Sequence, residues 1–117
     1  MVKFIRALKR EIVEGTEMFE PKIKNHQTDL LMKAVILLHD EEDAYRFFED
    51  LCTIPEIKSI SQRLEVAELL RKKETYQKIA EETGASSATI SRVNRALTYG
   101  ADGYRRVLKK IGTNEGK

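Results

Sequence analysis

The chain is poor in the residues that break helices, form disulfides or cross membranes. Its 117 residues include six glycines, two prolines, one cysteine and no tryptophan. Because Cys52 is alone, no intramolecular disulfide can form, which fits a cytoplasmic protein. The longest uninterrupted apolar run, residues 34–38, is too short for a membrane span, and charges interrupt every apolar stretch near the N-terminus. We therefore expect neither a membrane segment nor a signal peptide.

A large excess of charge of one sign is also missing. Lysine and arginine number 21 against 19 aspartates and glutamates, so the formal net charge is only +2. The charges are nevertheless unevenly distributed. Residues 40–50 hold six carboxylates against Arg46, whereas residues 86–111 hold six basic side chains against Asp102. A basic C-terminal third is the electrostatic footprint that binding to nucleic acid requires.

The composition favours an all-α fold in a single main domain. Apolar residues make up 41% and charged residues 34%, and no stretch alternates with the period of a strand. An apolar pattern over residues 2–14 predicts one helix, and polar residues 17–27 read as a linker. Residues 1–27 thus form an N-terminal extension: an accessory helix, an arm that wraps a partner, or a segment foreign to the natural chain.

Six helices are expected in the body of the chain. The first is capped by Thr28 or Asp29 and ends near His39, and the second opens at Asp40. A third helix, or a bent pair, follows Thr53, with core candidates at Ile57, Ile60, Leu64, Ala67, Leu69 and Leu70. Shorter helices follow over residues 75–83, 87–99 and 102–111, and residues 112–117 read as a disordered tail.

Residues 75–95 have the anatomy of a helix-turn-helix. Ala80 supplies the small residue needed where two helices cross, and Gly84 supplies a turn residue that tolerates positive φ. Ile90 and Val93 fall where the second helix must contact the first. Four positions separate Ala80 from Gly84, six separate Gly84 from Ile90, and three separate Ile90 from Val93. This combined spacing is much more specific than a single glycine, so the pattern predicts a DNA-binding motif.

With Ile90 and Val93 facing inward, hydroxyl-bearing and basic side chains come to the outside of the second helix. Small residues at its start permit close approach to a major groove, while arginines reach phosphates or guanine edges. Ser86 or Ser87 caps this helix, and the start of the first helix suits contacts with the DNA backbone. The candidate DNA-binding residues are Thr75, Tyr76, Gln77, Ser86, Ser87, Ala88, Thr89, Ser91, Arg92 and Arg95.

Two other classes of function compete with DNA binding. An enzyme is not expected, because His26 and His39 each lack a spaced metal-binding partner and no phosphate loop or nucleophile elbow occurs. The alternative is a protein–protein interaction module that acts on other transcription factors. A hydroxyl-rich, basic face argues against it, since protein interfaces favour aromatic residues.

Three segments resemble the Trp repressor superfamily and, more closely, its TrpR-like YerC/YecD branch. They are residues 45–57, 62–70 and 83–92, and the resemblance extends over residues 28–111. It implies a six-helix, intertwined homodimer in which each subunit carries one helix-turn-helix. It also implies a repressor-like transcriptional regulator, nucleoid-associated in the cytoplasm, that binds a palindromic double-stranded DNA operator.

The same resemblance defines a possible effector pocket. Arg63 matches the arginine that holds the carboxylate of tryptophan, Thr53 matches a pocket threonine, and Arg92 matches the arginine that stacks on the indole. Two positions depart from the pattern: Val93 replaces a glycine that leaves room for the ring, and Ala96 replaces a serine that contacts the ligand. We therefore expect Val93 to close the cavity and DNA binding to need no tryptophan.

A closed cavity leaves Arg63 without a ligand. A structural ion pair with a nearby carboxylate such as Glu56 is then its expected role. No cofactor is predicted, and a small-molecule corepressor other than tryptophan stays open as an alternative.

Overall fold

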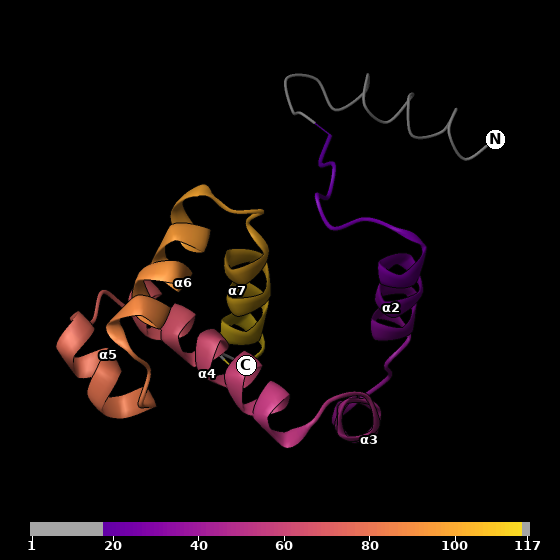
Figure 1. Ribbon diagram of the computed structural model, residues 1–117, viewed down its shortest axis with the longest axis horizontal. Helices are drawn as coiled ribbons and strands as arrows, with labels where there is room; N and C mark the ends of the chain where they lie inside the picture. Colours follow the sequence, from indigo (N-terminus) through magenta and orange to yellow (C-terminus); the bar gives the residue numbers. More distant parts are fainter. Residues whose placement is uncertain (1–17, 116–117) are drawn as a thin grey trace. The chain divides into compact units, whose positions relative to one another are not determined.

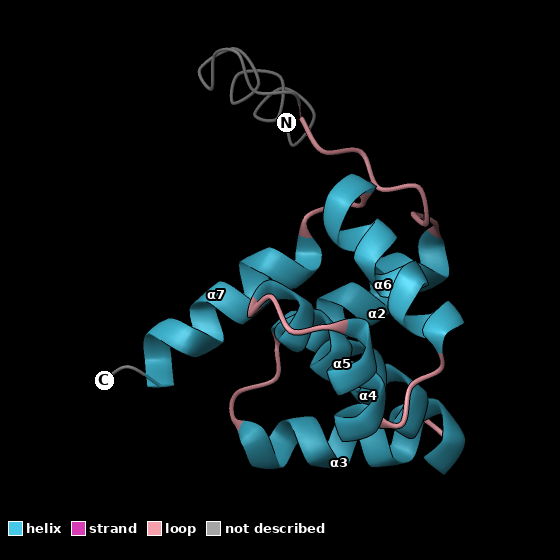
Figure 2. Cartoon of the chain, turned by 90° about the vertical axis from the view of Figure 1, so that its left-hand side faces the viewer, coloured by secondary structure: helices cyan, strands magenta, loops and turns pink. Residues whose placement is uncertain are grey.

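The computed structural model describes residues 18–115, with side chains described for residues 18–112. All regular structure in this range is α-helical, which confirms the predicted fold class (Figures 1 and 2). The helix expected over residues 2–14 lies outside the described residues. Contacts divide the chain into two units between Ile36 and Leu37. The helices are α2 (His26–Ile36), α3 (Glu41–Leu51), α4 (Ile54–Arg71), α5 (Tyr76–Thr83), α6 (Ser87–Tyr99) and α7 (Gly103–Glu115).

Helix α2 begins and ends before the predicted positions. The Thr28 amide donates to Asn25 Oδ1 at 2.9 Å, and the Asn25 amide donates to Thr28 Oγ1 at 2.8 Å. The prediction that Thr28 or Asp29 caps this helix is therefore wrong. Asparagine is among the strongest N-caps, so Asn25 starts the helix three residues earlier and Thr28 completes the cap from the first turn.

Helices α3 and α4 start where the sequence predicted, after Asp40 and Thr53. Asp40 Oδ1 accepts the Asp43 amide at 2.9 Å, and Thr53 Oγ1 accepts the Glu56 amide at 3.2 Å. Glu56 Oε1 in turn accepts the Thr53 amide at 2.8 Å, which closes a capping box. The hydrogen bond from the Thr53 amide stabilises the ionised carboxylate of Glu56 and lowers its pKa. A hydrogen bond with the Thr53 side chain lowers this pKa further. The 18 residues of α4 form one helix and not a bent pair.

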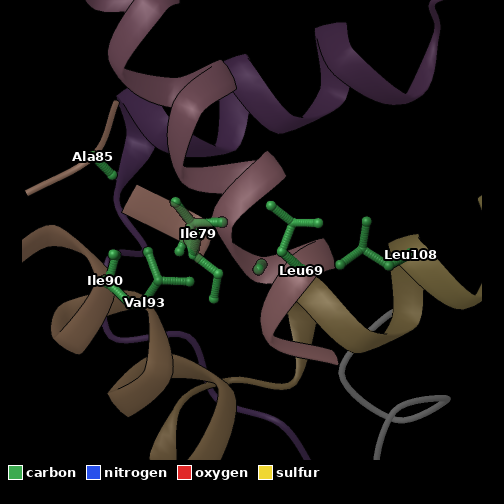
Figure 3. Packing of buried hydrophobic residues seen from close by; sticks show 8 residues of the cluster. Leu69, Ile79, Ala85, Ile90, Val93 and Leu108 are labelled. Carbon is green, nitrogen blue, oxygen red and sulfur yellow. The ribbon is translucent and has the colours of Figure 1, made fainter. Parts of the chain in front are cut away.

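The core lies where α5, α6 and α7 pack on α4 (Figure 3). Ile79 of α5 and Ile90 of α6 are fully buried, and Val93 is only 1% exposed. These side chains close the contact that the helix-turn-helix spacing predicted. The complete buried cluster consists of Val66, Ala67, Leu69, Ile79, Ala85, Ile90, Val93 and Leu108.

Only part of the predicted apolar face of α4 is buried. Ala67 and Leu69 are in the core, and Ile57 and Leu70 are partly buried. Ile60 and Leu64 are exposed, at 44% and 36%, so their assignment to the core of one chain is wrong. The described neighbours cover the C-terminal half of α4 better than its N-terminal half. No helix in the described part of the chain is long and apolar enough to cross a membrane.

Helix α7 extends further than the sequence predicted. It runs through Gly112 to Glu115. The prediction of a disordered tail from residue 112 onward therefore placed the end of the helix too early. A single glycine inside a helix costs only about 1 kcal/mol relative to alanine and does not stop it. Asp102 precedes the helix, as expected, with its carbonyl accepting the Arg106 amide at 3.3 Å.

Candidate nucleic-acid interface

The N-terminus of α5 presents polar side chains to solvent. Thr75 caps the helix through its Oγ1, which accepts the Lys78 amide at 3.2 Å. Tyr76 and Gln77 occupy the first turn and are exposed. The three residues predicted to contact a DNA backbone thus lie together at one helix end, where unpaired amides favour an anion.

The only lysine of α5 is neutralised by its own neighbours. Lys78 Nζ lies 3.2 Å from Glu74 Oε2 and 3.9 Å from Glu82 Oε1. The hydrogen bond to the Glu74 carboxylate, helped by the charges of Glu74 and Glu82, raises the pKa of Lys78. Lys78 therefore contributes little net positive charge to the surface of α5.

The turn between α5 and α6 depends on a glycine in the left-handed region. Gly84 has φ 75°, and its amide donates to the Ala80 carbonyl at 2.9 Å. Thr83 Oγ1 donates to the Ile79 carbonyl at 2.8 Å and accepts the Ala85 amide at 3.1 Å. These hydrogen bonds hold the turn in the single shape that sets the direction of α6.

A residue that sequence reasoning missed anchors this turn to the rest of the fold. Gln62 on α4 donates through Nε2 to the Thr83 carbonyl at 3.1 Å, in a partly buried position. The two residues are 21 positions apart and the acceptor is a main-chain atom. No sequence pattern therefore signals the pair.

The start of α6 is fixed by Ser86, which settles the choice between the two predicted caps. Ser86 Oγ accepts the Thr89 amide and donates to Thr89 Oγ1, both at 3.1 Å. The hydroxyls of Ser86 and Thr89 are therefore engaged with each other. Both residues are predicted DNA contacts; Ser86 is exposed, whereas Thr89 is partly buried.

The remaining predicted contacts share one exposed face of α6. Helical spacing places them opposite the buried Ile90 and Val93. Within the described part of the chain, neither arginine of this face forms an ion pair, so both guanidinium groups are available to an anion. The face consists of Ser87, Ala88, Ser91, Arg92 and Arg95, all exposed.

The residues of the candidate effector pocket have separate environments. Thr53 caps α4, Arg63 Nη1 donates to Ser59 Oγ at 2.8 Å, and Arg92 is exposed. Val93 is buried in the core, as its replacement of a smaller residue predicted.

The expected ion pair between Arg63 and Glu56 does not form. The Glu56 carboxylate instead accepts the Thr53 amide in the capping box, because that partner is three residues away and held by the helix start. Arg63 bonds to the hydroxyl of Ser59, one turn before it on the same helix.

An apolar hollow of about 460 Å³ lies between α4, α6 and α7. Ala96 is the one candidate pocket residue that lines it. Its other lining residues are Leu64, Ala101, Gly103, Tyr104 and Val107. Such a wall carries no charged group that could bind the carboxylate or amino group of an amino acid.

The chain is similar over most of its length to one family of known proteins. The family model for Trp repressor protein matches residues 26–112, close to the 28–111 predicted. The protein YerC of Bacillus subtilis (strain 168) is 52% identical over 94 residues, which cover 80% of this chain and 90% of YerC.

Two solved structures share the fold. A TrpR-like protein from Eubacterium eligens ATCC 27750 superposes with a TM-score of 0.74 at 57% identity, covering 78% of this chain and 94% of its own. A candidate Trp repressor from Staphylococcus aureus gives a TM-score of 0.74 at 44% identity, and the match covers 82% of this chain and 96% of that protein. Since family model, sequence and fold agree, this chain belongs to the Trp repressor family, in its TrpR-like YerC branch.

Proposed function

We propose that this protein is a sequence-specific DNA-binding transcriptional regulator, repressor-like, in which α5 and α6 form a helix-turn-helix. The observation that carries the proposal is the exposed, hydroxyl-rich and basic face of α6 opposite its buried side. Such a face enters a major groove with small residues closest to the bases and arginines reaching further. Membership of the Trp repressor family supports this assignment.

Each part of the motif has its own task in this proposal. Ser87, Ala88 and Ser91 approach the base edges, and Arg92 and Arg95 bind a guanine edge or phosphates. Thr75, Tyr76 and Gln77 contact the DNA backbone at the start of α5. Ser86 and Thr89 fix the start of α6 through their mutual hydrogen bonds.

We further propose that the active form is an intertwined homodimer. Apolar side chains on three helices stay exposed in one chain, among them Leu51 of α3 at 50%, Ile54 of α4 at 71% and Val107 of α7 at 50%. Large apolar side chains exposed on several helices are typical of a surface that a partner covers. A two-fold dimer would bind a palindromic operator in the cytoplasm, as a nucleoid-associated protein.

Tryptophan is not the effector in this proposal. Val93 fills the space between α6 and the core, and its side chain is 1% exposed. No charged residue lines the hollow next to Ala96. DNA binding would then be independent of tryptophan.

The experiment is selection of duplexes from a random pool by the full chain, followed by binding measurements over a range of salt concentrations. We expect a two-fold symmetric sequence and an affinity that falls steeply with salt, because each neutralised phosphate releases counterions. Failure to enrich any duplex would refute the proposal. An affinity for another transcription factor that barely responds to salt would instead support the protein-interaction alternative.

A matched pair of variants tests the α6 face. Arg92→Ala should weaken binding to the selected duplex by about 1–3 kcal/mol. Arg46→Ala is the control, because Arg46 lies on α3 and its Nε is 2.9 Å from Glu42 Oε2, away from the proposed face. Equal losses in both variants would show that only overall charge matters.

A further inference from the structure

The turn between α4 and α5 carries a lysine in a backbone conformation that lysine rarely adopts. Lys73 has φ 66°, and Asp102, at φ 67°, is the other non-glycine residue with positive φ in the described range. Aspartate tolerates this region because its short side chain bonds locally, and Asp102 Oδ2 lies 3.5 Å from Arg106 Nε. Lysine has no such compensation.

The hydrogen bonds of this turn identify the place of Lys73. The Lys72 amide donates to the Glu68 carbonyl, the last bond of the regular helical pattern. The next two amides fold back on the helix end: that of Lys73 donates to the Leu70 carbonyl at 3.0 Å, and that of Glu74 donates to the Leu69 carbonyl at 3.1 Å. At the left-handed position after a helix, glycine is the usual residue. A strained lysine at a position that suits glycine is a candidate for a functional role of its side chain.

The local charges leave that side chain without a partner. Lys72 Nζ lies 4.0 Å from Glu68 Oε1, and the Glu74 carboxylate is held by Lys78. Lys73 and Arg71 are exposed, and neither forms an ion pair with any residue that the structure describes. Two cations without an ion-pair partner among the described residues thus lie at the end of α4 and in the turn before α5.

We propose that Lys73, helped by Arg71 two residues before it, binds a DNA phosphate next to the phosphate that the start of α5 would contact. This inference rests on the proposed function, which it extends from the α5–α6 pair to the preceding turn. Lys73 is two residues before Thr75, so a duplex backbone that meets the start of α5 also passes the turn. The positive φ of Lys73 destabilises the folded chain, and in this proposal the contact between its ammonium group and a phosphate is the function that the strained position serves.

The test is a substitution series at position 73 in the full chain, measured on the duplex selected above. Lys73→Arg should bind like the wild type. Lys73→Ala and Lys73→Gly should bind roughly three- to tenfold more weakly at low salt, with the slope of log affinity against log salt shallower by about 0.9. Lys73→Gly should also raise the melting temperature by roughly 2–6 °C, since glycine adopts positive φ without strain.

Two controls separate failure of this inference from failure of the proposed function. Lys58→Ala removes an exposed lysine of α4 on the order of 20 Å along the helix from the turn and should leave binding unchanged. If Arg92→Ala weakens binding but Lys73→Ala does not, or if Lys58→Ala weakens it equally, the phosphate contact is refuted. If Lys73→Gly is no more stable than the wild type, the strain argument is refuted. If no duplex is selected at all, the proposed function itself fails.

Discussion

Replacing Gly100 with alanine should destabilise the protein for a steric reason, although its backbone conformation suits any residue. Gly100 ends α6 with φ −87°, and its amide donates to the Ala96 carbonyl at 2.8 Å. A Cβ built at this position would lie 2.3 Å from the Ala96 oxygen and 3.1 Å from the Ala96 carbonyl carbon. These are main-chain atoms of the preceding turn, so no side-chain rotation relieves the clash.

The cost can be worked out from what must move. Separating Cβ from the Ala96 oxygen stretches or breaks the closing hydrogen bond, which costs about 1 kcal/mol, and displaces the connection to α7, which costs about 1–2 kcal/mol more. We therefore expect Gly100→Ala to lower the free energy of unfolding by about 2–3 kcal/mol.

Two other glycines provide matched comparisons. At Gly84 the nearest atom to an added Cβ is Gln62 Nε2 at 3.9 Å, so the cost of alanine is only that of the φ of 75°, about 1 kcal/mol. At Gly103 no atom lies within 4 Å of an added Cβ, and alanine in the first turn of α7 should stabilise by about 0.4–1 kcal/mol.

The assay is urea unfolding followed by circular dichroism, with all variants at one protein concentration because association would shift the midpoint. The expected order of stability is Gly103→Ala, wild type, Gly84→Ala, then Gly100→Ala. A Gly100→Ala variant as stable as Gly84→Ala would refute the steric reasoning.

Three further predictions concern Val93, Gln62 and Glu56. Calorimetric titration of the wild type with tryptophan should give no heat at micromolar concentrations, and Val93→Ala should lower the free energy of unfolding by about 2 kcal/mol; binding of tryptophan would contradict a closed cavity. Gln62→Met should lower the unfolding free energy by about 1 kcal/mol, and Gln62→Glu by more, since a carboxylate repels the Thr83 carbonyl; equal stability would show that this hydrogen bond is dispensable. The folded-state pKa of Glu56 is lowered below its ordinary value of 4.5, so its stabilisation is present above that value and lost as pH falls through the folded-state pKa. The melting-temperature advantage of the wild type over Glu56→Gln should therefore shrink from about pH 7 to about pH 3, and a constant difference would contradict the assignment.

Local rules predicted most of the helix starts and the turn. Asp40, Thr53 and Thr75 stand at the helix starts that the sequence predicted and cap them, and Gly84 adopts the expected left-handed conformation. In each case the partner is within four residues, so the sequence alone contains both members of the interaction. The failure at α2 was also local, because Asn25 competes with Thr28 for the same role and starts the helix first.

Features that depend on distant partners could not be predicted in this way. Periodicity identified Ile60 and Leu64 as apolar positions of a helix, but it does not say which element covers them, and in one chain neither is buried. Gln62 gave no signal because its partner is a main-chain oxygen 21 residues away. The burial of Val93 was predictable because two helices joined by a short turn can pack in few ways, which fixes the side of the second helix that faces the first.

The anchoring of the turn by Gln62 has a consequence for retargeting the protein. Because Gln62 holds the main chain and not a side chain, the support is indifferent to which residues occupy the outward positions of α6. Those positions could be exchanged as a cassette, leaving the packing beneath them intact. If α6 contacts DNA as proposed, new sequence preferences could be engineered, or acquired during divergence, without rebuilding the scaffold.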